Sequence, residues 1–223
     1  MRILEEIYLW IEFFIRNLPG VIGRKIRYYY YKLRLAKCGK NVVFDLGVII
    51  QNPQDVFLGN NIWIDKGVII IAGKIQGNRK VLRKTNPDYI FKEGELHIDD
   101  NVHIAPYAVL QAHGGIHIKK SSGIASGAKI YSLSHHHSNL LDKSDTKKYA
   151  FTPLESSENQ FLVLGAVVMH EKSALGLNSV ILPGTIIPKE TWVGVNTFIV
   201  GQTLEDKAIY ATAAAQNIKR NKG

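Results

Sequence analysis

The sequence predicts a parallel β-helix that is preceded by N-terminal helices. Aliphatic residues recur every six positions from residue 44 onward, and small or turn-forming residues often follow them. The first 40 residues lack this spacing and are divided by Pro19-Gly20, which breaks a helix. An α-helix would space its apolar residues about 3.6 apart and an open hairpin sheet would alternate, so a spacing of six indicates neither.

The six-residue spacing is sustained over most of the chain. Three such units form one triangular coil of about 18 residues, and successive coils stack at the ~4.8 Å spacing of β-strands. The last series is the longest, with seven consecutive members. The series are Phe44, Ile50 and Val56; Leu58, Ile64 and Ile70; Ile98, Ile104, Leu110 and Ile116; Ile118, Ile124 and Ile130; and Val163, Met169, Leu175, Ile181, Ile187, Val193 and Ile199.

Small residues occupy a second fixed position, four residues after each aliphatic one. One large residue facing inward and small residues at a bend describe a short strand followed by a corner. In the last series this position holds Val167, Ser173, Ser179, Thr185, Thr191 and Thr197.

The N-terminal segment, residues 1–40, is apolar and aromatic but also charged. Glu5, Glu6, Glu12 and Arg16 interrupt its first half, so it fits neither a membrane-spanning helix nor a signal peptide. We expect amphipathic helices here.

Much of the net charge of +9 is concentrated in the same region. A basic, aromatic segment predicts peripheral association of residues 1–40 with an anionic membrane, and packing on the domain or on a partner subunit is the alternative. We expect a cytoplasmic location, peripheral at the inner face of the membrane, and no nucleic-acid partner, because the segment has no recognisable reading motif. Between Phe13 and Phe44 there is no acidic residue and there are eight basic ones, Arg16, Arg24, Lys25, Arg27, Lys32, Arg34, Lys37 and Lys40.

Two polar insertions interrupt the repeat, near residues 73–96 and 135–160. The expected organisation is therefore a helical segment 1–40, a β-helix 41–204 with these two insertions, and a tail 205–223. Function in a repeat protein tends to lie on such insertions. The second one begins with His135, His136 and His137, which form either a catalytic site or a polar surface loop.

The single cysteine, Cys38, excludes an internal disulfide and a multi-cysteine zinc site within one chain, and it suits a reducing compartment. Its basic neighbours could lower the pKa of the thiol and make Cys38 a candidate nucleophile. A mechanism based on histidine needs no such nucleophile.

Several segments carry a resemblance to a known family. The run 175-LGLNSVILPGTIIPKETWVGVNTFIVG-201 resembles the hexapeptide-repeat acyltransferases, whose fold is a left-handed β-helix. The stretch 124-IASGAKIYSLSH-135 resembles the segment of maltose- and galactoside-type acetyltransferases that ends in their catalytic histidine. The tail 210-YATAAAQNIKR-220 resembles the closing segment of the family, and the Leu-Pro-Gly and Cys-Gly-Lys-Asn features look like members from bacterial polysaccharide biosynthesis.

The resemblance implies an acetyl-CoA-dependent acetyltransferase that acts on a hydroxyl of a sugar or polysaccharide intermediate of the capsule or lipopolysaccharide type. His135 would be the general base, with direct transfer in a ternary complex, because histidine titrates near neutral pH. N-acetylation of an amino sugar nucleotide is the alternative. The family also implies a homotrimer with active sites between neighbouring subunits.

The same resemblance assigns further site residues. The backbone N–H of Leu177, beside Gly176, would stabilise the oxyanion, and the pantetheine arm of acetyl-CoA would pass Gly194 and Val195. Lys219 or Arg220 would lie near the nucleotide phosphates, and His113 and His137 are candidate substrate-binding residues. The sequence departs from the family at Val200-Gly201, where a Thr-Lys pair is common, and at Ala174, where a tryptophan is common.

Two other classes compete with this interpretation. Gamma-type carbonic anhydrases use the same fold and hold zinc with three histidines, and His113 and His117 stand four apart here. The histidine spacing does not match that family, so we expect no metal. A non-catalytic β-helix that serves as a scaffold, with the basic N-terminus as a docking arm, is the third possibility.

Overall fold

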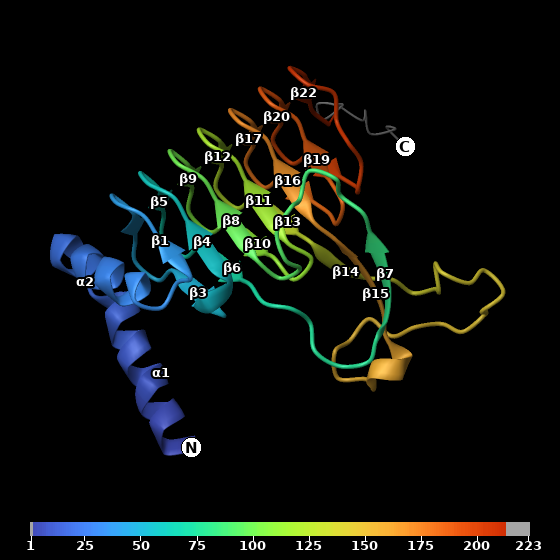
Figure 1. Cartoon of the computed structure of the whole chain (residues 1–223), viewed down its shortest axis with the longest axis horizontal. Helices are drawn as coiled ribbons and strands as arrows, with labels where there is room; N and C mark the ends of the chain where they lie inside the picture. The colour runs from blue at the N-terminus through green and yellow to red at the C-terminus, as the bar shows by residue number, and fades with distance from the viewer. Residues whose placement is uncertain (1, 213–223) are drawn as a thin grey trace, which may run out of the picture.

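The computed structural model describes residues 2–212 and shows a left-handed parallel β-helix preceded by two helices, as predicted (Figure 1). The helices are α1 (Arg2–Asn17) and α2 (Gly20–Lys32). Three sheets, which we call A, B and C, form the sides of the triangular coil. Neither these helices nor any other part of residues 2–212 offers a helix long and apolar enough to cross a membrane.

Each sheet takes one short strand from every coil. Sheet A contains β1 (Lys37–Cys38), β4 (Val56–Leu58), β8 (Leu96–Ile98), β11 (Ile116–Ile118), β16 (Val167–Met169) and β19 (Ile186–Ile187). Sheet B contains β2 (Val43–Phe44), β5 (Trp63–Ile64), β9 (His103–Ile104), β12 (Gly123–Ile124), β17 (Ala174–Leu175), β20 (Trp192–Val193) and β22 (Ile209–Tyr210). Sheet C contains β3 (Ile49–Gln51), β6 (Ile69–Ile71), β10 (Val109–Gln111), β13 (Lys129–Tyr131), β18 (Val180–Ile181) and β21 (Phe198–Ile199).

The residues that recur every six positions fill the inside of the coils. In sheet C they stack directly on one another, and each is at most 5% exposed. Burying one such aliphatic side chain stabilises the fold by about 1.5–3 kcal/mol, and the ladder repeats in all three sheets. The sheet C ladder runs Ile50, Ile70, Leu110, Ile130, Ile181 and Ile199.

The corner between sheets A and B depends on a left-handed backbone. Asn41, Asn61 and Asn101 have φ angles of 55°, 54° and 60°. Asparagine tolerates this conformation better than most residues. Their side-chain amides also bond to one another along the stack, at 3.0 and 3.2 Å, so the corner is closed by side chains as well as by backbone.

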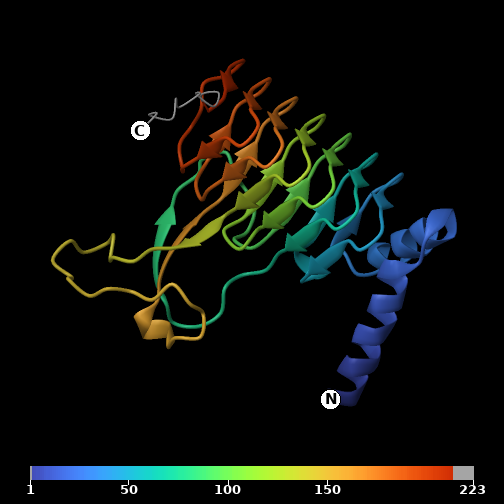
Figure 2. The same ribbon diagram turned by 180° about the vertical axis from the view of Figure 1, so that it is seen from behind.

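Both insertions leave the β-helix at the corner between sheets C and A, and they meet in a fourth sheet. Strand β15 (Phe161–Gly165) pairs antiparallel with β14 (Leu133–His135) and parallel with β7 (Lys80–Lys84). Figures 1 and 2 show this sheet beside the coils, with both insertions extending on the same side of the molecule. Residues 80 positions apart in sequence are thereby joined.

Helix α2 covers the free edge of the first coil. The N–H groups of the first coil donate to the second, as Val43 does to Ile62, so its own carbonyl oxygens are left unpaired at the edge. The helix supplies donors for them. The Arg27 guanidinium and the hydroxyls of Tyr28 and Tyr31 donate to Phe44, Gly39 and Val48, at 2.8, 3.1 and 3.0 Å.

Arg27 also joins α1 to α2. It is 1% exposed, and its Nη1 donates to the Leu18 carbonyl at 2.6 Å, just beyond the C-terminal end of α1. Its Nη2 lies 4.0 Å from the carboxylate of Asp45. A buried cation at a helix C-terminus is favourable because the last carbonyls there have no partner within the helix. The basic residue at position 27 is therefore structural.

We expect Gly23→Ala to destabilise the protein by about 1–3 kcal/mol, because α1 and α2 meet at this glycine. An added Cβ would lie 2.0 Å from the Leu18 carbonyl oxygen, which is backbone and cannot rotate away. Gly123→Ala is the matched control, since a Cβ there meets nothing within 4 Å. Urea unfolding would measure both. Equal midpoints for the two variants would contradict the tight helix contact.

Candidate active site

The two insertions and the β-helix enclose a cavity of about 460 Å³ at the corner between sheets C and A. Two of the histidines selected from the sequence, His113 and His135, line this same cavity although they come from successive coils. The full lining is Lys74, Ile75, Gln76, Arg79, Gln111, His113, Leu133, His135, Pro153, Gln160 and Leu162. Basic, neutral polar and apolar groups thus converge in one place.

His113 follows strand β10, and a backbone carbonyl fixes its ring. Its Nδ1 lies 2.7 Å from the Gly73 carbonyl oxygen. Because a carbonyl can only accept, Nδ1 carries the proton, and the neutral ring then has an unprotonated Nε2. His113 can therefore accept a proton or a hydrogen bond through that nitrogen.

His135 is the last residue of β14 and is partly buried beside Phe151, with ring centroids 5.5 Å apart. Burial lowers its pKa, the positive charge of Arg79 lowers it further, and the backbone of Ala150 acts in the opposite direction. Its Nδ1 is buried and has no hydrogen-bond partner among residues 2–212. The neutral form, which can act as a base, is therefore favoured at neutral pH.

Arg79 holds the two insertions together beside His135. Its Nε donates to Oε1 of Gln160 at 2.9 Å, and its Nη1 contacts the Gln76 carbonyl. Gln160 is 1% exposed, so the guanidinium is anchored on a rigid group. Sequence reasoning did not select Arg79 or Lys74. Their only signal was the polar, basic character of the insertion at 73–96.

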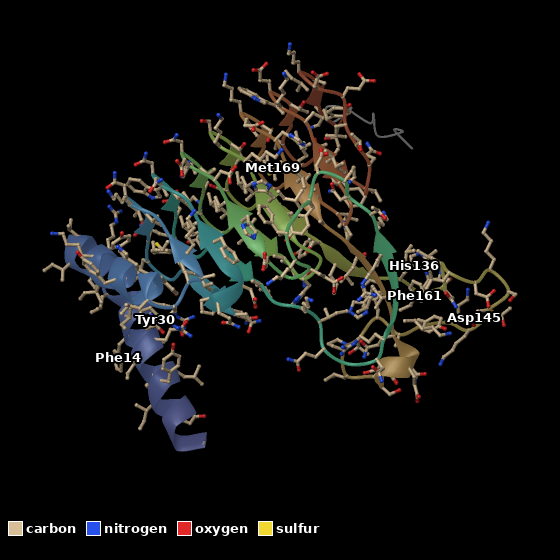
Figure 3. The ribbon with its side chains drawn as sticks, viewed as in Figure 1. Phe14, Tyr30, His136, Asp145, Phe161 and Met169 are labelled. Atoms are coloured by element: carbon tan, nitrogen blue, oxygen red, sulfur yellow. The ribbon has the colours of Figure 1, made fainter. Side chains whose placement is uncertain are left out.

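His136 and His137 lie outside the cavity lining. Their rings stack on each other with centroids 4.7 Å apart, and the His137 carbonyl accepts from the Tyr149 N–H at 2.9 Å. Figure 3 shows His136 close to Phe161, at the base of the second insertion. The structure does not bring His137 to the cavity with His113 and His135.

The carboxylates near the second insertion stabilise the loop and are not bonded to His135. Asp145 accepts from the Tyr149 hydroxyl at 2.7 Å, from Asn139 at 2.8 Å and from Lys80 at 3.1 Å. These hydrogen bonds, that of Tyr149 first, hold the pKa of Asp145 well below its usual range. In Figure 3 Asp145 lies out in the loop. Asp145 thus orders the loop that follows the histidines.

The residues expected to contact the cofactor occupy another corner. Gly176, Leu177, Gly194 and Val195 lie between sheets B and C, across sheet C from the histidine cavity. A Cβ on Gly176 would lie 2.6 Å from the carbonyl carbon of Gly194, so coil stacking alone requires glycine there. Within one chain these residues do not join the histidine cavity. Lys219 and Arg220 lie outside the described residues.

The remaining histidines are distributed over separate faces. His103 lies 2.8 Å from Asp65 and His170 lies 2.7 Å from Asp88. His117 lies 3.1 Å from Asp99 under the Phe91 ring. Across residues 2–212 no group of three histidine, cysteine or acidic side chains could hold a metal ion.

Cys38 does not have the reactive thiol that its basic neighbours suggested. It lies in β1 at the edge of the hydrophobic core, and burial raises its pKa to about 11 despite the opposing charge of Lys32. The expectation of a lowered pKa was therefore wrong. Desolvation of the thiolate outweighs the nearby lysine.

We expect Cys38 to react with iodoacetamide at pH 8 about 10²-fold more slowly than free glutathione, because a thiol of such high pKa is almost entirely protonated there. Mass spectrometry would follow the modification over time. In urea the rate should approach that of glutathione. A native rate equal to glutathione would show that the thiolate is stabilised in the fold.

Two curated relatives resemble the chain, while no family model matches it. The dTDP-4-amino-4,6-dideoxy-D-glucose acyltransferase of Escherichia coli is 24% identical over 156 residues, which cover 70% of this chain and 67% of that protein. The putative lipopolysaccharide biosynthesis O-acetyl transferase WbbJ of Escherichia coli K12 is 27% identical over 130 residues, covering 58% and 63%. The matches thus span about two thirds of each relative.

Solved structures show the same fold. AntD, an N-acyltransferase from Bacillus cereus in complex with dTDP and 3-hydroxybutyryl-CoA, has a TM-score of 0.64 and 22% identity, covering 88% of each chain. Its complex with dTDP-4-amino-4,6-dideoxyglucose and coenzyme A gives 0.64 and 23%. The resemblance to the hexapeptide-repeat acyltransferases that the sequence predicts is confirmed.

Proposed function

We propose that this protein transfers an acyl group from an acyl-CoA, acetyl-CoA in the first instance, to a sugar. The carrying observation is that His113 and His135 line one cavity on a β-helix whose curated relatives are sugar-modifying acyltransferases. The acceptor that we propose is a hydroxyl of a sugar or polysaccharide intermediate of the capsule or lipopolysaccharide type. The proposed compartment is the reducing cytoplasm, at the inner face of the membrane.

In the proposed reaction His135 is the general base. Its neutral imidazole takes the hydroxyl proton as the acceptor oxygen attacks the thioester carbonyl, the carbon–sulfur bond breaks, and coenzyme A leaves as a thiol. No covalent enzyme intermediate is needed, because the thioester is already activated. General-base catalysis of this kind is worth roughly 10²–10⁴-fold. His113 would orient the acceptor through its unprotonated Nε2, since Gly73 holds the other nitrogen.

The oxyanion is proposed to be stabilised by the backbone N–H of Leu177 in a neighbouring subunit. Leu177 is 47% exposed at the far edge of sheet C, so it can face another chain but not the His135 cavity of its own. A fixed N–H at a rigid corner suits this role because it needs no reorganisation. We therefore propose a homotrimer, a closed cyclic assembly, in which Gly176, Gly194 and Val195 flank the pantetheine arm.

N-acylation of a nucleotide-linked amino sugar is the second candidate. It is favoured by the likeness to AntD, an N-acyltransferase that binds dTDP-4-amino-4,6-dideoxyglucose, and by Lys74 and Arg79 in the cavity, which suit a phosphate group. A panel of sugars, nucleotide-linked amino sugars and lipid-linked glycans with acetyl-CoA, followed by thiol release, would separate the two. Turnover confined to the amino sugars would overturn the hydroxyl acceptor.

His135→Ala should lower turnover by about 10²-fold or more, because it removes the proposed base while leaving the oxyanion and coenzyme contacts in place. His136→Ala is the matched control, since the neighbouring ring lies outside the cavity, and it should retain most activity. His137→Ala tests whether that histidine reaches the acceptor. Light scattering and melting temperature should be unchanged in all three. More than a third of wild-type turnover in His135→Ala would assign the base elsewhere, with His113 next.

Arg79→Gln should move the acid limb of the kcat/KM profile to higher pH. Because burial and Arg79 both lower the pKa of His135, the wild-type limb should lie below the ordinary histidine value of about 6.5. Removing the charge lets this pKa rise, so activity at pH 6 should fall relative to that at pH 8.

Arg83→Gln is the control for that experiment. It removes the same charge from strand β7, but Arg83 pairs with Glu93 at 2.9 Å and does not line the cavity. Its acid limb should coincide with that of the wild type. Identical profiles for all three proteins would show that Arg79 does not act on the base.

A further inference from the structure

Helices α1 and α2 each carry an exposed apolar stripe. Along α1 the stripe is Ile7, Trp10, Ile11, Phe14 and Leu18, whose members are 36–61% exposed. Proteins that stay in water rarely leave adjoining large apolar side chains uncovered without a partner. Along α2 the stripe is Ile22, Ile26, Tyr29 and Leu33, at 38–88% exposed.

Helix α1 is held firmly in an orientation that points away from the coils (Figures 1 and 2). Glu12 accepts from Arg34 at 2.8 Å and from the Tyr30 hydroxyl at 3.1 Å, and the Arg34 guanidinium lies over the Tyr8 ring at 4.6 Å. In Figure 3 Tyr30 lies where the helices meet, and Phe14 lies on the outer side of α1. The charged and hydroxyl groups thus face α2, which leaves the apolar stripe uncovered.

The aromatic residues of α1 contact one another rather than the β-helix. The ring centroids of Trp10, Phe13 and Phe14 are 5.7–6.4 Å apart. Tryptophan and phenylalanine on one side of an amphipathic helix suit the boundary between lipid headgroups and acyl chains. The cluster has the composition of an interfacial helix.

Positive charge lies next to these stripes. Lys25, Lys32 and Lys40 are exposed, and no acidic residue occurs between Phe13 and Phe44. A cavity of about 480 Å³ opens between α2 and the first coil, where lysine and tyrosine side chains converge. Its lining is Val21, Arg24, Lys25, Tyr28, Tyr29, Lys40, Asn41, Val42 and Val43. Amines and phenol hydroxyls in an open cavity fit a phosphate headgroup.

We propose that α1 and α2 form a docking surface for an anionic phospholipid bilayer. Trp10 and Phe14 enter the boundary of the acyl chains, and Lys25 and Lys40 contact lipid phosphates. A second copy of the chain fits this surface less well, because it would bring two basic clusters of the same sign together. This surface deepens the proposed location at a membrane, and its test does not depend on acyl transfer.

The docking surface and the catalytic insertions share one side of the molecule. In both Figure 1 and Figure 2 α1 and the second insertion project in the same direction from the β-helix. A bilayer bound through α1 would therefore lie on the side of the insertions that line the histidine cavity. On the proposed function, this placement favours an acceptor that is carried by a lipid.

Vesicle flotation of the full chain tests the proposal. At low salt the protein should float with phosphatidylcholine vesicles that contain 30% phosphatidylglycerol and remain unbound with phosphatidylcholine alone. Trp10→Ala/Phe14→Ala and Lys25→Glu/Lys40→Glu should each weaken binding about tenfold or more, and added salt should weaken the wild type. In a Trp63→Phe/Trp192→Phe protein, the remaining Trp10 fluorescence should shift to the blue on binding.

Matched controls lie at the other end of the β-helix. Trp192 is 57% exposed on β20, and Lys207 is exposed beyond it, so Trp192→Ala/Lys207→Glu makes comparable changes away from the helices. This variant should float like the wild type. Wild-type protein that fails to float with the anionic vesicles would overturn the proposal. So would a Trp10→Ala/Phe14→Ala variant that floats normally but changes mass in light scattering, since a second copy would then cover the stripe.

Discussion

The stacking of coils at a fixed strand spacing is the constraint on which the rest of this structure depends. Every coil must place one apolar residue per side directly over that of the previous coil, so no strand can gain or lose a residue without breaking the ladder. Insertions are tolerated only at corners, and both leave from the corner between sheets C and A. The Gly73 N–H bonds to the Gly94 carbonyl at 2.8 Å, and the Gly165 N–H bonds to the Ser132 carbonyl at 3.0 Å, so each insertion is closed at its base.

This closure also shapes the candidate site. Gly73 forms the base of the first insertion, and its carbonyl oxygen sets the tautomer of His113. Ser132 forms the base of the second, and His135 follows it in a strand that pairs with Leu162. The groups that would handle a proton therefore stand where flexible excursions join the rigid coil. Their positions are set by the backbone of the coil, which is a common way to place reactive groups accurately.

The coils could be predicted because their signal is local and repetitive. A spacing of six predicted which residues are inside, and His113 and His135 could be selected as polar residues at corners or from the family resemblance. The pairing of β7 with β15 could not, because 80-KVLRK-84 shows no six-residue pattern and its partner is 81 residues away. The role of Arg79 depends on that pairing. Cys38 misled because charge is visible in a sequence, whereas the burial of its thiol is not.

The donors on α2 determine how many coils the molecule can have. A β-helix with bare carbonyl oxygens at its first edge is a template on which another chain can continue the stack, and growth of that kind leads to fibres. Arg27, Tyr28 and Tyr31 occupy those carbonyls with side-chain donors that offer no further strand. The helix thus acts as a chain terminator for end-to-end polymerisation. A protein built from a periodic element that could extend indefinitely is in this way kept to a finite length.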